Sequence, residues 1–295
     1  MTYKAELILD VKTALGESPM WNPHDDCLYF VDITSGELHR YNPSGGGHHV
    51  WRRETMLGCI AVGNDGSLVA GSHEGFVRLI IDKGRLVETP LKIFGAEFEC
   101  MRMNDGTCDR QGRFWAGSMN YAPNPSQPDG ALYRLDADGS HAKINADLLV
   151  ANGMAFSPDG KRFYMSDTHP TSSSIWAYDY DIDNGMPSNR QLFADTKQQL
   201  GRPDGAAMDV DGCYWSAAND AGLIHRYTPT GEIDISIKVP TAKPTKICFG
   251  GRDYKTMYIT SIRPDDVLDD ENAGGLFALE LPYQGIAETE FNFTK

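Results

Sequence analysis

The stretch Asn152-Gly-Met-Ala-Phe-Ser-Pro-Asp159-Gly160 joins a polar residue, a short apolar run and a turn. Two other stretches are built in the same way, Asn-Asp-Gly-Thr-Cys-Asp-Arg-Gln-Gly at 104–112 and Asp-Gly-Ala-Ala-Met-Asp-Val-Asp-Gly at 204–212. In all three, the polar residue stands eight positions before the closing glycine. A pattern that recurs at a fixed phase is typical of a repeat protein, and residues at the same phase occupy equivalent places in the fold.

The whole chain follows this repeat. The turns lie near Asp26, Asp65, Gln111, Asp159, Asp211 and Asp253. They are 39 to 52 residues apart, and each is followed by two short runs rich in aromatic and β-branched residues. This spacing suits one four-stranded propeller blade per repeat, and no long segment has helical periodicity. We therefore predict an all-β fold, a single six-bladed β-propeller domain over residues 1–295, with the run at 5–9 closing the last blade.

The composition limits the classes of partner. The chain has 27 Lys and Arg against 41 Asp and Glu, a formal net charge of −14. It therefore lacks the basic surface that nucleic-acid binding requires. The N-terminus shows no secretory leader, and no stretch approaches the roughly 20 apolar residues of a membrane helix. We expect a cytoplasmic protein that binds neither nucleic acid nor a membrane, and a monomer by default.

Several common site motifs are missing from the sequence. The six cysteines show no C-x-x-C spacing, so we expect small buried hydrophobic residues and no zinc or redox motif. There is no Gly-x-Ser-x-Gly elbow, P-loop or dinucleotide fingerprint. His48 and His49 follow a run of glycines and are predicted to be solvated loop residues.

The repeat also predicts a site. The innermost strand of each blade lines the channel, so equivalent positions form a ring around one mouth. The predicted ring is Glu17, Gly58, Asn104, Asn152, Asp204 and Lys246, with Glu17 placed by its Gly-Glu-Ser-Pro context. Two facing carboxylates would repel, and a divalent cation would relieve this repulsion. Carboxylate and amide oxygens suit Ca²⁺, Mg²⁺ or Mn²⁺, with water completing the shell. The alternative is that the Asn-Gly and Asp-Gly pairs only bond the backbone of turns.

Arg102, Lys246 and two long loops are expected near this ring. Arg102, two residues before Asn104, points to the same side of an extended strand and could donate to a substrate oxygen. The alternatives are a surface arginine or a partner for Asp105, and the role of Lys246 is equally open.

The Pro-rich stretch at 120–130 and the stretch at 263–274 are predicted to interrupt blades between their second and third strands. We expect a wall or lid over the channel there, with ordinary surface loops as the alternative.

The motifs resemble those of the family of senescence marker protein (regucalcin), gluconolactonase and luciferin-regenerating enzyme. They are Leu15-Gly-Glu-Ser-Pro19 with Trp21, Asp32-Ile33, Arg102-Met-Asn-Asp-Gly106, Gly112-Arg-Phe-Trp-Ala-Gly117, Asn152-Gly-Met-Ala-Phe-Ser-Pro-Asp159, Pro203-Asp-Gly205 and Cys248-Phe-Gly-Gly251. The resemblance implies a six-bladed propeller with one catalytic divalent metal. Glu17, Asn152 and Asp204 match the family's metal ligands, and Arg102 and Asn104 match its substrate contacts. The loop that shapes the family's sugar pocket corresponds here to the stretch around Tyr121, which varies between members.

We therefore expect a metal-dependent hydrolase that opens a small-molecule sugar lactone to its aldonic acid. In this hypothesis a water bound to the metal, or next to it, attacks the lactone, and Asp204 acts as general base. Calcium fits the ligand types best, and family members also use zinc, manganese, magnesium or iron(II). Two alternatives are a non-catalytic calcium-binding regulatory propeller and an arylester or organophosphate hydrolase on the same metal site.

Overall fold

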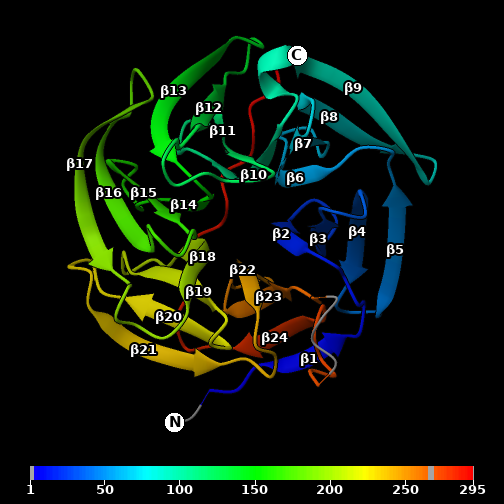
Figure 1. Cartoon of the computed structure of the whole chain (residues 1–295). Helices are drawn as coiled ribbons and strands as arrows, with labels where there is room; N and C mark the ends of the chain where they lie inside the picture. The colour runs from blue at the N-terminus through cyan, green and yellow to red at the C-terminus, as the bar shows by residue number, and fades with distance from the viewer. Residues whose placement is uncertain (1–2, 265–268, 295) are drawn as a thin grey trace.

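The computed structural model describes residues 3–264 and 269–294. Within these residues it has twenty-four strands and one 3₁₀ turn, η1 (Ala96–Phe98). The strands form six four-stranded antiparallel sheets arranged in a ring around a central axis (Figure 1). The predicted all-β, six-bladed propeller is therefore confirmed.

Each sheet is built from strands that follow one another in the chain. Sheet 1 consists of β2 (Gly16–Asn22), β3 (Cys27–Asp32), β4 (Glu37–Asn42) and β5 (Gly47–Arg52). Sheet 2 consists of β6 (Leu57–Val62), β7 (Leu68–Ser72), β8 (Gly75–Asp82) and β9 (Arg85–Ile93). Sheet 3 consists of β10 (Met101–Cys108), β11 (Phe114–Asn120), β12 (Gly130–Leu135) and β13 (His141–Leu148).

The second half of the ring repeats this arrangement. Sheet 4 consists of β14 (Ala151–Phe156), β15 (Arg162–Asp167), β16 (Ser174–Asp181) and β17 (Met186–Asp195). Sheet 5 consists of β18 (Arg202–Met208), β19 (Tyr214–Asn219), β20 (Leu223–Tyr227) and β21 (Ile233–Lys238). Sheet 6 consists of β22 (Pro244–Gly250), β23 (Thr256–Ser261), β24 (Leu276–Glu280) and β1 (Glu6–Leu9).

Sheet 6 joins the two ends of the chain. Its outer strand β1 pairs antiparallel with β24, with Leu7 opposite Phe277. The strand therefore covers the edge that β24 would otherwise expose, which matters because an open strand edge invites pairing with other chains.

Aromatic side chains fill the wedges between neighbouring sheets. Trp115 of sheet 3 packs against Phe163 of sheet 4 with ring centroids 5.8 Å apart. Its Nε1 donates a 3.0 Å hydrogen bond to the Tyr180 hydroxyl, which donates in turn to Asp109 at 2.6 Å. Large rings of this kind suit the strands because β-branched and aromatic side chains pack well on pleated surfaces. Contacts between sheets thus hold the inner strands in place.

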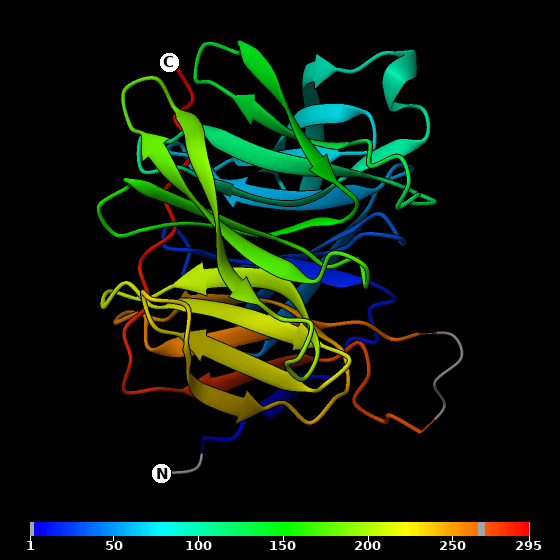
Figure 2. The same cartoon turned by 60° about the vertical axis from the view of Figure 1, so that its left-hand side comes forward.

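The C-terminal segment crosses one mouth of the ring. Val210 N donates to Gln284 O at 2.9 Å on sheet 5, and Asn64 N donates to Phe291 O at 3.0 Å on sheet 2. Figure 2 shows this segment along one face of the molecule, and the described residues 262–264 and 269–275 between β23 and β24 on the opposite face. The two mouths therefore differ: one is crossed by the chain end and the other is bordered by loops.

Several smaller predictions can be compared with the structure. The stretch at 120–130 does separate β11 from β12, and 263–274 lies between β23 and β24, although 265–268 fall outside the described residues. All six cysteines are free, and all are buried except the exposed Cys100. The loop prediction for His48 and His49 is wrong: both lie on the outer strand β5, where His48 is hydrogen-bonded to His39 at 3.0 Å.

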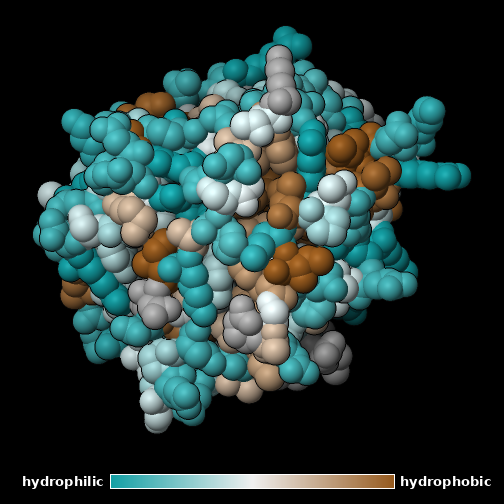
Figure 3. Space-filling model, turned by 90° about the horizontal axis from the view of Figure 1, so that it is seen from above, coloured by the Kyte–Doolittle hydropathy of each residue, from teal (hydrophilic) through white to brown (hydrophobic). Residues whose placement is uncertain are grey.

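The surface of the ring is mainly polar on the side seen from above (Figure 3). Figure 3 shows one side of the ring, which is largely hydrophilic with a few separate apolar patches. Exposed apolar residues such as Val87 and Ile93 lie on the outer strand β9. In the described part of the chain, no helix has the length and apolarity needed to cross a membrane.

Candidate active site

The predicted ring residues all lie on innermost strands. Glu17 is on β2, Asn104 on β10, Asn152 on β14, Asp204 on β18 and Lys246 on β22, and none is more than 6% exposed. The pairing register shifts at this level in every one of the six inner strands. Such β-bulges re-aim side chains and are common next to active sites. The repeat therefore turns its polar side chains into the channel at one common level.

The remaining ring position, Gly58 on β6, carries no side chain for a steric reason. A β-carbon there would collide with the backbone oxygen of Met103 on β10. The close approach of these two strands thus requires glycine and leaves this part of the ring without a polar group.

Arg102, Asn104 and Asn152 form a hydrogen-bonded chain across two sheets. Arg102 Nη1 donates to Asn104 Oδ1 at 2.6 Å, and Asn104 Nδ2 donates to Asn152 Oδ1 at 3.0 Å. Arg102 is buried and bonds Asn104, so neither a surface position nor a pairing with Asp105 describes it. An amide oxygen has two lone pairs, so Asn152 Oδ1 can accept this bond and still serve as a ligand.

Two residues that the sequence reasoning missed hold the predicted ligands. Thr168 Oγ1 accepts a 2.7 Å bond from Asn152 Nδ2 and donates to Pro203 O at 2.7 Å, which links sheets 4 and 5. Asn219 Nδ2 donates to Asp204 Oδ2 at 2.8 Å. A signal for the second residue was present, because the second strand of every sheet ends in a polar residue. These residues are Asp32, Ser72, Asn120, Asp167, Asn219 and Ser261.

The two ring carboxylates are buried and influence each other. Burial raises the pKa of Glu17 well above its usual range, and the charge of Asp204 raises it further. Burial also raises the pKa of Asp204, to about 7, although the hydrogen bond from Asn219 opposes this. Oδ1 of Asp204 is buried and has no hydrogen-bond partner among the residues that the structure describes. Removing carboxylates from water in this way is costly unless a positive charge compensates.

These residues fit a divalent cation. The hard donors of the kind that Ca²⁺ and Mg²⁺ prefer are two buried carboxylates and the amide oxygen of Asn152, and one carboxylate has an oxygen without a hydrogen-bond partner in the described part of the chain. Among residues 3–264 and 269–294, no three His, Cys, Asp or Glu side chains gather as a metal cluster. A cation here would therefore depend on the amide and on water, as the sequence indicated. The roles of Glu17, Asn152 and Asp204 as ligands stay predictions.

Lys246 and Tyr121 occupy different parts of the mouth. The Lys246 ammonium is paired with Asp105 and donates to Gly106 O at 2.9 Å, so two of its three N–H groups are already bonded. Tyr121 lies on the loop after β11 and is 46% exposed, with its hydroxyl 3.9 Å from Met56 Sδ. The pKa of Tyr121 is raised by partial burial, and the Arg102 charge opposes this rise. The phenol is therefore within electrostatic reach of Arg102, as a pocket-wall residue would be.

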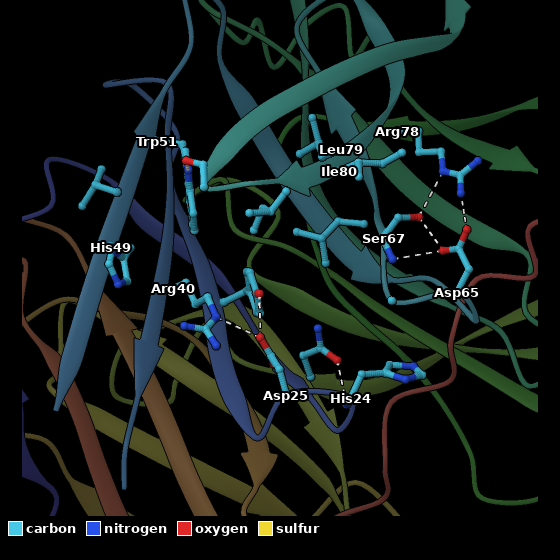
Figure 4. Close-up of a pocket in the computed structure, with 17 residues that line it drawn as sticks. His24, Asp25, Arg40, His49, Trp51, Asp65, Ser67, Arg78, Leu79 and Ile80 are labelled. Carbon is cyan, nitrogen blue, oxygen red and sulfur yellow. Dashed lines mark hydrogen bonds and ion pairs between the residues drawn. The ribbon is translucent and has the colours of Figure 1, made fainter. Parts of the chain in front are cut away.

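A separate cavity lies between sheets 1 and 2. It has a volume of about 710 Å³. Trp51 and Ile80 line one side of it, and Asp25 and Arg40 line the other (Figure 4). Its charged residues are paired, Arg40 Nε with Asp25 at 2.8 Å and Arg78 with Asp65. None of the ring residues lines this cavity, so it is separate from the candidate active site at the ring mouth.

Comparison with known proteins places the chain in a family. A family model described as the SMP-30/gluconolactonase/LRE-like region matches residues 15–263. The chain belongs to this family. The resemblance seen in the sequence motifs is thus confirmed, and the SMP-30/gluconolactonase/LRE-like members compared below share its fold or its sequence over nearly the whole chain.

Similar proteins include named lactonases. A 6-deoxy-6-sulfogluconolactonase from Pseudomonas putida is 38% identical over 288 residues, which cover 95% of each chain. A pentonolactonase from Haloferax volcanii is 33% identical and covers 95% of this chain and 96% of its own. A structure described as the calcium-binding protein regucalcin from Agrobacterium tumefaciens has a TM-score of 0.91 at 25% identity, covering 99% of this chain and 98% of its own.

Proposed function

We propose that this chain is a hydrolase that opens the cyclic ester of a sugar lactone to give the aldonic acid, with one divalent cation in the ring mouth. The observation that supports the proposal is that Glu17, Asn152 and Asp204 are buried on inner strands where the pairing register shifts, and that Oδ1 of Asp204 has no hydrogen-bond partner among the described residues. The lactonase names of relatives that cover 95% of the chain support the reaction class.

Glu17, Asn152 and Asp204 would hold the cation. Calcium is the first candidate because the donors are carboxylate and amide oxygens and because a similar structure is described as calcium-binding. Zinc, manganese, magnesium and iron(II) are the other ions to compare. When bound, the cation would supply positive charge that polarises the lactone carbonyl and lowers the pKa of water.

Asp204 is the proposed general base. Its Oδ2 accepts a hydrogen bond from Asn219, so the unbonded Oδ1, which has a second lone pair beside the one offered to the cation, would take the proton from the attacking water. The water oxygen bonds to the lactone carbonyl carbon, and the ester bond between this carbon and the ring oxygen breaks. The ring oxygen leaves as a hydroxyl by receiving the proton from the same carboxyl group. The product is the open-chain aldonic acid.

Arg102, Asn104 and Tyr121 are the proposed substrate-binding residues. The bonds of Arg102 to Asn104 and to Met103 O both come from Nη1, and Nε and Nη2 make no hydrogen bond to the described residues. These N–H groups are available to the carbonyl oxygen as negative charge develops, or to a sugar hydroxyl. The Tyr121 loop would form the wall against which the sugar packs.

The test is to remove bound metal and measure acid release from a panel of aldonolactones, including a pentonolactone and a gluconolactone. Each divalent ion is then added back, and the spontaneous hydrolysis of each lactone is subtracted. We expect hydrolysis to disappear with the metal and to return with at least one ion. Hydrolysis that is indifferent to chelator would contradict the proposed cation, and an absence of hydrolysis for every lactone and ion would contradict the proposed reaction.

The calcium-binding description of the regucalcin structure also favours a second candidate, a non-catalytic calcium-binding propeller. The two candidates differ in outcome: tight Ca²⁺ binding without turnover of any lactone would support the second. An arylester and a phosphotriester belong in the same panel. If either is turned over faster than the sugar lactones, it replaces them as the proposed substrate class.

A further inference from the structure

A buried ion pair spans the channel next to the candidate active site. Lys246 projects from β22 of sheet 6, and its ammonium is paired with Asp105 on β10 of sheet 3. These strands lie on opposite sides of the ring (Figure 1). Asp105 Oδ2 also accepts a 2.9 Å bond from Met154 N on β14. One ion pair therefore ties together the inner strands of three sheets.

The fold makes room for this pair. A β-carbon at Gly205, directly after Asp204, would collide with the aliphatic part of the Lys246 side chain. The lysine can therefore cross the channel only because β18 has a glycine at this point. The ammonium at the far end is secured by a second bond, to Gly106 O at 2.9 Å. Both partners are almost fully buried, with Asp105 1% and Lys246 3% exposed.

A buried pair of this kind is a weak source of stability. Replacing one by uncharged groups of similar size is often neutral, whereas removing a single partner leaves a costly unpaired charge. Its position suggests another role. Asp105 and Lys246 belong to the charges that act on Glu17, with opposite signs, and Asp105 also acts on Asp204. Glu288, from the C-terminal segment, is a weaker influence on Lys246.

Five charged side chains at the mouth bear on cation binding. Glu17, Asp204 and Asp105 are acidic, and Arg102 and Lys246 are basic. Because Lys246 and Asp105 cancel each other, an incoming cation meets two carboxylates and one guanidinium. If Asp105 were neutral, the unpaired ammonium would repel the cation, and if Lys246 were neutral, the unpaired carboxylate would attract it. Buried charges are only weakly screened, so both effects should be large.

We infer that Lys246 and Asp105 are a positioning pair that sets the affinity of the ring mouth for a divalent cation through the balance of their two charges. The inference rests on the proposed cation site. It gives Lys246 a role in the ring that is neither ligand binding nor proton transfer.

The experiment measures Ca²⁺ and Mn²⁺ binding by isothermal titration calorimetry to metal-free protein. It compares the wild type with D105N, K246M and the double variant D105N/K246M. We expect D105N to weaken binding by about tenfold or more, K246M to strengthen it, and the double variant to return within about threefold of the wild type. D136N is the control, because it changes the net charge by the same amount as D105N. Asp136 pairs with Arg134 on sheet 3, away from the mouth.

Opposite signs with recovery in the double variant are the signature of charge balance. If D105N and the double variant bind equally weakly, the pair serves only to hold the strands, and the inference is overturned. Unchanged binding in D105N overturns it as well. If D105N does not fold, folded K246M decides the matter, since binding weaker than wild type contradicts the inference. A wild-type protein that binds neither ion would instead contradict the proposed function.

Discussion

Asn219 donates a 2.8 Å hydrogen bond to Oδ2 of Asp204, and the other oxygen of that carboxylate is buried with no partner within residues 3–264 and 269–294. The carboxylate is thus held at one oxygen and free at the other. A ligand and proton acceptor needs this combination, because a fixed carboxylate presents its free oxygen in one orientation.

Replacing this donor should damage catalysis more than folding. We expect N219A to lower kcat by about 10- to 100-fold, because Asp204 loses the bond that orients it. Steady-state kinetics on the best lactone, with the metal saturating, would measure this. N120A is a matched control, since Asn120 holds the equivalent place at the end of β11 but bonds the exposed Asp129. Equal effects of the two substitutions would contradict an orienting role for Asn219.

Thr168 should couple the cation site to the stability of the ring. In T168V both Asn152 Nδ2 and Pro203 O lose their bond to the hydroxyl. We expect a loss of about 1–3 kcal/mol in the free energy of unfolding, the usual cost of unpaired buried polar groups, together with weaker cation binding. Urea unfolding and calorimetry would measure the two effects. T168S retains the hydroxyl and should stay close to wild type, so a large loss in T168S would argue against the hydrogen bonds as the cause.

Arg102 should act on the substrate and not on the cation. We expect R102M to lower kcat/KM by about 100- to 1000-fold, the range seen when an oxyanion donor is removed. It should not weaken Ca²⁺ binding, because a positive charge near the site is lost. Parallel kinetics and titration would separate these effects. Weaker Ca²⁺ binding in R102M would instead show that Arg102 supports the ligands through Asn104.

His39 should make the protein less stable in acid. Burial lowers the pKa of His39 to about 4, with a smaller contribution from His48. The unfolded chain, with a pKa of about 6.5, binds the proton first as pH falls. Stability should therefore fall from about pH 6.5 to about pH 4, by at most about 3 kcal/mol from this group. Glu37 Oε2 lies 3.1 Å from Nε2 and would favour the charged form, which reduces this figure. The opposing effects of Asp32 and Arg52 are already part of the lowered pKa.

The measurement is the difference between wild type and H39Q in urea-unfolding free energy at pH 7 and pH 5. The loss on acidification should be smaller in H39Q. H49Q, at an exposed position on the same strand β5, is the control and should follow the wild type. A pH dependence that is identical in H39Q and wild type would show that His39 is not the group responsible.

The ring of polar residues could be predicted because it follows the phase of the repeat. Asn104, Asn152 and Asp204 each stand at the same distance from a turn glycine, and the architecture then fixes where they meet. The equivalent residues reach one common level because every inner strand has a bulge. No residue pattern in the sequence predicts these bulges.

Other parts of the site depend on contacts that have no local signal. Lys246 and Asp105 are 141 positions apart, and only the closed ring places them across one channel. Asn219 shares its place at a strand end with Asp32 and Asp167, but those two accept bonds from backbone N–H groups of the preceding loops. The same sequence position thus has two different uses, and only the structure distinguishes them.

The pairing of β1 with β24 has a consequence for how the molecule is made. Glu6 lies opposite Ala278, so the last sheet needs residues from both ends of the chain. During synthesis on a ribosome, the earlier sheets have all their strands before the chain is finished, whereas β1 must wait for its partner. Contacts so distant in sequence form slowly, and an unpaired strand is open to misassociation in the meantime. The step that completes the ring is therefore the point at which a truncated or stalled chain is most exposed to aggregation.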